Sequence, residues 1–213
     1  GDKDAQKLQA ILNKIKEGLE QAQNVRQLDF SDKEREEVVH GLQLLTDKPV
    51  LYVCNVSESD AAGGNPLVEK VQEIATTENA EVLTLAVSIE ADINELDTFE
   101  ERQVFLEDLG LTEPGAAKLI RKAYALLKQQ TYFTAGEKEV RAWTFPLGAT
   151  APQAAGVIHT DFEKGFIRAE VISFEDYENF KTETKVKEAG KMRIEGKEYI
   201  VQDGDVMHFR FNV

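Results

Sequence analysis

The sequence predicts a mixed fold, α/β in its middle and α+β at its C-terminal end, preceded by a helical hairpin. Three patterns support this prediction: helically spaced apolar residues at 4–23, a strand, a helix and a strand within 49–87, and two-residue alternation at 166–172. We therefore expect three parts: a coiled-coil-like helical hairpin at 1–46, part of an open parallel sheet at 47–130 and a self-contained α+β unit at 131–213.

The N-terminal part carries a heptad-like seam on one face of a helix. Its members recur at alternating spacings of four and three, at Leu8, Leu12, Ile15, Leu19 and Ala22. A capping box, Ser31-Asp32-Lys33-Glu34, opens a second helix with apolar residues on one side. The pattern indicates two antiparallel helices whose seam packs the hairpin on itself; the alternative is a seam that binds a partner as a coiled coil.

The middle part reads as a strand, a crossover helix and a second strand, followed by helices at 98–110 and 112–129. Residues 49–55 are almost wholly apolar, as in strands that are covered on both faces. Asn65-Pro66 begins a helix, and a right-handed crossover places the next strand, 81–87, parallel to the first. Two parallel strands are too few for a stable open sheet. We therefore expect their apolar edge to pair with another copy of the chain, to be covered by the chain's own helices, or to promote aggregation.

The last part has the pattern of a mixed sheet with a helix. Strands at 132–134 and 139–144 flank a turn at Gly136, and residues 151–158 form a short helix. Residues 166–173 alternate between two kinds of side chain, which is typical of a strand with unlike faces. A turn at Asp203-Gly204 precedes the closing strand, 206–211.

The tetrapeptide Asn55-Val56-Ser57-Glu58 ends the first predicted strand, where open α/β sheets bind ligands. It has the outline of the base-reading Asn-Lys-x-Asp loop of GTPases, with Val56 in place of Lys and Glu58 in place of Asp. That Asp would accept two hydrogen bonds from guanine, whereas an Asn amide can pair with the amine and ring nitrogen of adenine. The loop predicts a nucleotide site tuned away from guanine; the alternative is that Asn55 only forms a turn.

Several ordered segments resemble the C-terminal part of the YchF/Obg-like ATPase family over about residues 42–213. They are 44–50, the Asn55 loop, 133–136, 139–143, 154–162 and 202–206. The resemblance implies a cytoplasmic P-loop NTPase of a GTP-binding protein family, which hydrolyses ATP, or GTP, with Mg²⁺. It also implies that residues 131–213 form a TGS domain, a small β-grasp module that contacts the ribosome or structured RNA. Ser88 and Ile89 would then lie at a second base-contacting loop.

The sequence departs from this family at the phosphate site. It contains no G-x-x-x-x-G-K-[ST] loop, since its adjacent glycines, Gly63-Gly64, are followed by Asn65-Pro66. Such a loop cradles the phosphates and places a hydroxyl on magnesium. We therefore expect a truncated product that begins inside the helical insertion, binds neither ATP nor Mg²⁺ tightly, has no catalytic residue of its own and is inactive alone. The alternative is a non-enzymatic module that binds RNA, the ribosome or a protein.

Charge and composition narrow the partners further. The net charge is −14, but residues 131–213 hold 11 Lys and Arg against 14 Asp and Glu, and thus carry only −3 of it. The acidic remainder argues against nucleic-acid binding through residues 1–130, because bound phosphates would face like charge. Candidate RNA- or partner-binding residues in the last part are Lys164, Arg168, Arg193 and Arg210, with ordinary solvated charges as the alternative.

Other site classes find little support in the sequence. There is no apolar run near the roughly 18 residues that a membrane helix needs, so we expect no membrane partner. The single cysteine, Cys54, lies in an apolar run and indicates a core residue in a reducing compartment. The three histidines are far apart and no metal site is predicted.

Overall fold

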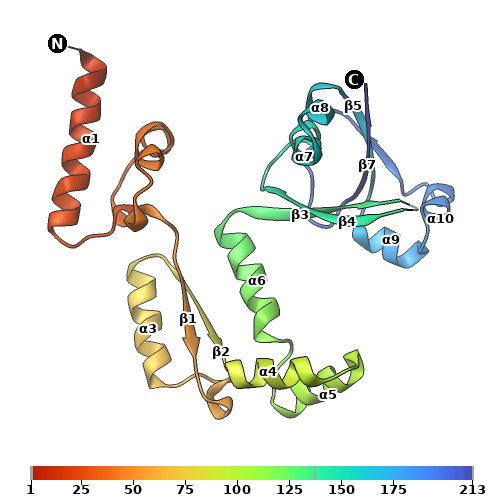
Figure 1. Cartoon of the computed structure of the whole chain (residues 1–213), viewed down its shortest axis with the longest axis horizontal. Coiled ribbons are helices and arrows are strands. Elements are labelled where there is room, and N and C mark those ends of the chain that lie inside the picture. The colour runs from red at the N-terminus through yellow and green to blue at the C-terminus, as the bar shows by residue number, and fades with distance from the viewer. Residues whose placement is uncertain (1, 137, 213) are drawn as a thin grey trace. The chain divides into compact units, whose positions relative to one another are not determined.

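A computed structural model describes residues 2–136 and 138–212, and it divides the chain into two compact units, Gly1–Leu126 and Leu127–Val213. Both units mix helices and strands, as Figure 1 shows along the chain from red to blue. The first unit holds a two-stranded parallel sheet, and the second holds a five-stranded mixed sheet. The predicted mixture of parallel and mixed sheets with helices is therefore confirmed.

The first unit consists of a helical N-terminal part and a small sheet with helices around it. Its helices and strands are α1 (Lys3–Glu20), α2 (Asp32–Glu34), β1 (Leu51–Asn55), α3 (Pro66–Thr77), β2 (Glu81–Leu85), α4 (Val87–Glu95), α5 (Phe99–Asp108) and α6 (Gly115–Leu126). A π-helical turn, Arg35–Val39, and short 3-10 turns, Val25–Gln27, His40–Leu42, Leu45–Asp47 and Glu58–Asp60, lie between them.

Helix α1 buries a narrower stripe than the predicted seam. Ile11, Ile15 and Gly18 are buried, whereas Leu8, Leu12 and Leu19 are 44%, 41% and 42% exposed. The helical segment after Ser31 is short and changes from α to π to 3-10 geometry before it ends at Leu42. It therefore cannot cover the whole length of α1, and much of the apolar seam stays at the surface.

Strands β1 and β2 are parallel, with Leu51 opposite Glu81 and Asn55 opposite Leu85. Helix α3 makes the crossover between them, and it begins where Asn65 Oδ1 accepts hydrogen bonds from two backbone N–H groups of the first turn. Because the two strands have the same direction and the same length of five residues, their C-terminal ends lie side by side. The residues immediately after each strand are thereby brought together.

The second unit is built on a sheet of order β4-β3-β7-β5-β6, in which β3 and β7 are parallel and the other neighbours are antiparallel. Its elements are β3 (Gln129–Ala135), β4 (Val140–Pro146), α7 (Ala151–Ile158), α8 (Thr160–Lys164), β5 (Phe166–Ile172), α9 (Phe174–Phe180), α10 (Glu183–Glu188), β6 (Arg193–Glu195) and β7 (Val206–Phe211).

The core of this unit forms between helix α7 and the sheet. Buried alanines of α7, among them Ala154, let the helix approach the strands closely. The Tyr132 ring lies 5.6 Å from the rings of both Phe145 and Phe209, measured between centroids. Its hydroxyl donates a hydrogen bond to the Ala154 carbonyl at 3.0 Å, so the one polar atom of this large side chain is satisfied. Burial raises the pKa of Tyr132.

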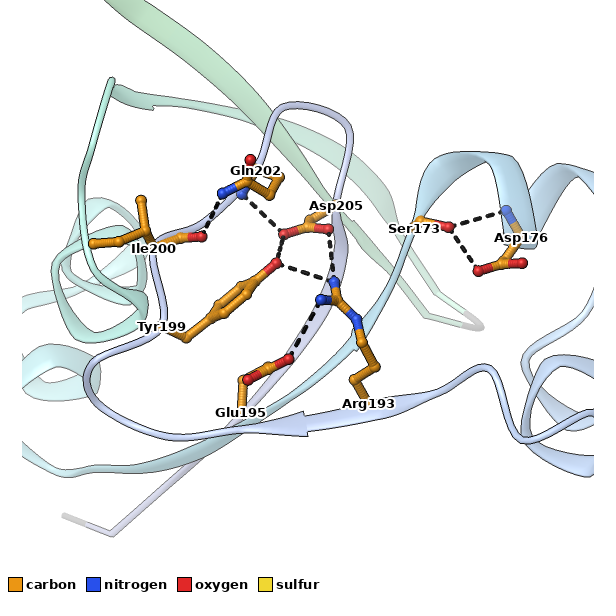
Figure 2. A network of polar contacts seen from close by, with 8 residues as sticks. All are labelled: Ser173, Asp176, Arg193, Glu195, Tyr199, Ile200, Gln202 and Asp205. Atoms are coloured by element: carbon orange, nitrogen blue, oxygen red, sulfur yellow. Dashed lines mark hydrogen bonds and ion pairs between the residues drawn. The ribbon is translucent and has the colours of Figure 1, made fainter.

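A buried carboxylate fixes the loop that leads into β7 (Figure 2). Asp205 is 2% exposed, and its Oδ2 accepts hydrogen bonds from the Tyr199 hydroxyl at 2.7 Å and the Gln202 N–H at 3.0 Å. The Arg193 guanidinium lies 3.4 Å from Asp205 Oδ1 and compensates its charge. Burial, together with the bond to Asp205, raises the pKa of Tyr199 to about 12. The sequence signal was only the turn at Asp203-Gly204, where Gly204 has a φ of +83°.

We predict that Asp205→Ala lowers the free energy of unfolding of the chain by about 2 kcal/mol, since it leaves two partly buried donors and one cation without their acceptor. Denaturant unfolding followed by circular dichroism measures this change. Glu198→Ala, at an exposed position of the same loop, is the matched control and should change stability by less than about 0.5 kcal/mol. Equal stability of the two variants would show that the network contributes nothing.

Candidate functional site

The ends of β1 and β2 are joined by two hydrogen bonds that fix the start of the Asn55-Val56-Ser57-Glu58 loop. The Val56 N–H donates to the Leu85 carbonyl at 3.0 Å. The Val87 N–H donates to the side-chain Oδ1 of Asn55 at 3.1 Å. Because Leu85 ends β2 and Val87 begins α4, the loop is bonded on both sides of the turn between them. We call residues 55–58 the base-side loop.

The chain beyond the base-side loop is also held by side-chain contacts. Asp60 Oδ2 accepts a hydrogen bond from Asn65 Nδ2 at 2.9 Å, and this bond, with that of Ser57, lowers the pKa of Asp60. The Gly64 N–H donates to the Asp60 carbonyl at 2.7 Å, and Gly64 has a φ of +72°, which favours glycine. The connection from β1 to α3 is therefore an ordered turn with its own internal bonds.

The structure brings Ser88 to the neighbourhood of the base-side loop but buries Ile89. Ser88 is exposed in the first turn of α4, next to the residue that Asn55 binds. Ile89 is 1% exposed and packs with Ala86, Ile93 and Leu106. Its side chain therefore lies beneath the surface and offers no face of its own to a ligand.

Residues 88–90 form the first turn of a helix, although the sequence pattern indicated a loop there. The strand was expected to reach Val87, but β2 ends at Leu85 and α4 begins at Val87. Asn55 supplies the first-turn acceptor from another element, a contact that local sequence patterns do not reveal. The signal that could have identified the helix is the spacing of four between the buried residues Ile89 and Ile93.

The side-chain amide of Asn55 already makes one hydrogen bond within the chain, through its oxygen. Its oxygen accepts the Val87 N–H, which orients the Nδ2 group and its two N–H donors. A donor at this place can bond to a ring nitrogen, an acceptor that adenine and guanine share. The predicted two-bond pairing with adenine would need the second lone pair of the same oxygen. Discrimination between the purines therefore falls mainly to Glu58, which is exposed on the same loop.

The space between the strand ends and the helices is too small for a base. A cavity of about 10 Å³ is lined by residues that include Leu85, Ala86, Ile89, Glu90 and Gly115. This is room for about one water molecule. A purine at the base-side loop would therefore rest against the exposed side of residues 55–58.

The residues at the base-side loop do not fit a magnesium ion. Within residues 2–136 and 138–212, no three histidine, cysteine or acidic side chains are grouped so that they could hold a metal. The carboxylate of Asp60, just beyond the loop, is bonded to Asn65. Among the described residues, the loop thus offers hydrogen-bonding groups and no cluster of ligands for a metal ion.

Two of the four candidate RNA-binding residues lie together on the sheet of the second unit. Arg168 of β5 and Arg210 of β7 are cross-strand partners, and both are exposed. The Arg210 guanidinium bonds both carboxylate oxygens of Glu170, at 3.1 and 3.3 Å, and thereby lowers the pKa of Glu170. Neighbouring His208 is exposed as well. This face combines three basic side chains with one acidic one.

The other two candidates are placed differently. Arg193 is directed to Asp205 and Tyr199, so its charge is largely used inside the unit. Lys164 is exposed at the end of α8. Of the two aromatic residues near Lys164 in the sequence, Phe166 is buried, whereas Phe162 stacks on Phe211 with 3.8 Å between centroids.

Trp143 packs against the core of the second unit and is partly buried. Its Nε1 donates to Thr134 Oγ1 at 2.9 Å, and the Arg141 guanidinium lies 4.0 Å from its ring. Sequence reasoning missed this pair of Arg141 and Trp143. Their spacing of two residues in a strand, which puts both on one face, is the signal that could have found it.

No helix in the described ranges 2–136 and 138–212 has both the length and the apolar character required to cross a membrane.

A family model and similar proteins that match this chain all carry the name YchF. The family model YchF-GTPase_C, described as a protein of unknown function (DUF933), matches residues 129–212. The Ribosome-binding ATPase YchF of Escherichia coli O157:H7 is 57% identical over 213 residues, which are 100% of this chain and 58% of that protein. The Bacillus subtilis protein of the same name is 53% identical over 214 residues, with the same coverage. The chain thus spans less than two thirds of the length of these relatives.

Solved structures agree with the fold. The Schizosaccharomyces pombe YchF GTPase superposes with a TM-score of 0.82 at 37% identity, covering 98% of this chain and 55% of that one. A GTP binding protein from Pyrococcus horikoshii superposes with a TM-score of 0.55 at 16% identity, covering 86% of this chain and 58% of that one. The second likeness concerns the fold alone.

Proposed function

The chain belongs to the YchF family, and on this basis we propose that it supplies the purine-side wall and a ribosome-binding module of a longer, cytoplasmic P-loop NTPase that prefers ATP. Relatives that carry the name Ribosome-binding ATPase support the activity and the partner. In this proposal, residues 47–130 belong to the nucleotide-binding domain, 131–213 form a TGS domain of β-grasp type, and 1–46 form the helical hairpin.

The hydrogen bond from Val87 to Asn55 carries the nucleotide part of the proposal. It fixes the Asn55 amide so that its N–H donors are ready for a purine ring nitrogen, at no further cost in side-chain order. Val56 and Ser88 flank this amide as wall residues, and Ile89 supports them from below. Glu58 pairs with guanine less well than an Asp would, because its longer side chain shifts the carboxylate away from the two guanine N–H groups.

The phosphate part of the reaction is assigned to residues outside this sequence. The sequence has no G-x-x-x-x-G-K-[ST] loop, and the described residues offer no metal-binding group. We therefore propose that ATP and Mg²⁺ serve the longer protein and that this chain alone is hydrolytically inactive.

The nucleotide proposal predicts weak but selective base binding by the chain itself. In ¹⁵N NMR titrations, adenosine at millimolar concentration should shift the amide signals of Val56, Ser57 and Glu58 more than guanosine does. Asn55→Ala removes the oriented donor and should weaken adenosine binding by about tenfold, the value of roughly one hydrogen bond. Asn94→Ala, an exposed change in α4, is the control and should leave binding unchanged. Equal responses to both nucleosides, or none, would refute the assignment.

A second candidate function, ribosome or RNA binding by the second unit, is favoured by the face around Arg168 and Arg210. The two guanidinium groups occupy one cross-strand position, where they can meet neighbouring phosphates. The sheet order β4-β3-β7-β5-β6 supports a β-grasp module at this place. A binding module without enzymatic activity would need only this unit.

We predict that Arg168→Gln with Arg210→Gln weakens co-sedimentation of the chain with ribosomes, and lowers the slope of log affinity against log salt by roughly 1.5 for two lost phosphate contacts. Co-sedimentation over a range of salt concentrations measures both quantities. Lys197→Gln, on an exposed loop of the same unit, is the single-charge control. If the double variant and the control behave alike at every salt concentration, this face does not bind the ribosome.

We also propose self-association of the chain through the small sheet. In the described part of the first unit, β1 and β2 pair only with each other, and Val53 of β1 is 47% exposed. An unpaired, apolar strand edge is a template for another strand.

Light scattering should therefore show a mass that rises with concentration. Val53→Lys should suppress the rise, since a charge on an edge strand opposes pairing. Val104→Lys, at an exposed position of α5, provides the matched control. A mass that is independent of concentration for the unchanged chain would count against edge pairing.

A further inference from the structure

The carboxylate of Glu90 binds the start of helix α6. Glu90 of α4 accepts the Gly115 N–H with Oε1 at 2.6 Å and the Ala116 N–H with Oε2 at 3.0 Å. Gly115 and Ala116 begin α6, where backbone N–H groups have no partner within the helix. Both carboxylate oxygens of Glu90 thus accept hydrogen bonds from the start of a helix that lies 25 residues further along the chain.

Close packing makes this contact specific. A Cβ atom at Gly115 would lie 2.8 Å from the Leu85 Cβ and 2.9 Å from Glu90 Oε1, so the position needs a residue without a side chain. The start of α6 therefore rests on Leu85 as well as on Glu90. A negative side chain at this place also complements the positive end of the α6 dipole.

Leu85 contacts both the start of α6 and the base-side loop, and Val87, two residues further along, holds the loop as well. Leu85 accepts the Val56 N–H, and Val87 donates to Asn55 Oδ1. Residues 85–87 therefore lie between the base-side loop on one side and the start of α6 on the other. Glu90, in the first turn of α4, connects the two sides.

We infer that Glu90 is a positioning residue for the base-side loop, which it holds in place by joining residues 85–87 to the start of helix α6. Glu90 does not touch the base; it acts through residues 85–87. The inference gives the proposed nucleotide site a dependence on α6, and in that respect it rests on the proposed function. Any change that displaces the start of α6 should loosen Asn55, and, by linkage, a bound purine should stabilise the start of α6.

Amide hydrogen exchange in the unliganded chain tests this inference without reference to nucleotide. Glu90→Ala should raise the exchange rates of the Val56 and Val87 amides by about tenfold, in addition to those of Gly115 and Ala116. The Leu83 amide, inside β2, is the internal reference, because a general loss of stability would raise its exchange by the same factor. Glu95→Ala, an exposed change at the end of α4, is the matched control.

Two further variants keep the test decisive if Glu90→Ala folds poorly. Glu90→Gln retains one acceptor oxygen and should show an intermediate effect at Val56 and Val87. Gly115→Ala should displace α6 and release the same two amides while Glu90 is intact. If Gly115 and Ala116 exchange faster in these variants while Val56 and Val87 do not, Glu90 only caps a helix and the inference is wrong.

Adenosine titration of the same variants separates this inference from the proposed function. Faster exchange at Val56 and Val87 with a several-fold loss of adenosine affinity supports both. If the variants exchange faster at these amides but the unmutated chain shows no response to adenosine, the positioning role is supported and the nucleotide site is refuted. Unchanged exchange at Val56 and Val87 overturns the positioning role whatever the response to adenosine.

Discussion

The hydrogen bond between the Val87 N–H and the Asn55 side chain is the contact on which the candidate site depends. Parallel pairing of β1 and β2 brings the two strand ends together, and this bond fixes the residues just beyond each end. The Asn55 amide oxygen, on the last residue of β1, thereby accepts a bond from the first turn of helix α4 and fixes the orientation of the side-chain amide. A substitution of Asn55 would affect loop, helix and donors together, so the base-side loop is a product of tertiary structure.

Local patterns were sufficient to predict the elements that depend on local interactions. The strand β1, the start of α3 at Asn65-Pro66 and the helix that follows Thr98 are all present where the sequence placed them. Strand β1 is, however, not covered on both faces as expected, since Val53 is 47% exposed. Strand β5 also forms at 166–172, but a bulge between Phe166 and Arg168 breaks the predicted alternation, so that Phe166 is buried and Ile167 is 55% exposed. In each case the residues that decide the structure lie within a few positions of one another, and the pattern is therefore sufficient.

Contacts between distant segments decided the rest, and the sequence did not reveal them. The seam of α1 was predicted from spacing alone, but its burial depends on how much of the helix the segment after Ser31 can cover. Ile89 was expected at a second base-contacting loop, yet packing against Leu106 buries it. At the candidate site, Asn55 was identified from its motif, whereas the role of Glu90 lies in a contact 25 residues away. Arg193 was a candidate for RNA, and a buried Asp205 now accounts for its charge.

The two units differ in how they can serve a partner. The first offers a small parallel sheet and an ordered loop within an acidic segment, which disfavours a polyanion and for which we propose a purine ring. The second has a closed core and an exposed basic pair on its sheet. An intermolecular nuclear Overhauser measurement on the labelled chain with adenosine tests the central claim most directly. We expect cross-peaks between the adenine H8 proton, which is next to the acceptor nitrogen N7, and the side-chain amide of Asn55. Cross-peaks only to residues outside 55–58 and 88, or none at all at saturating nucleoside, would contradict the account.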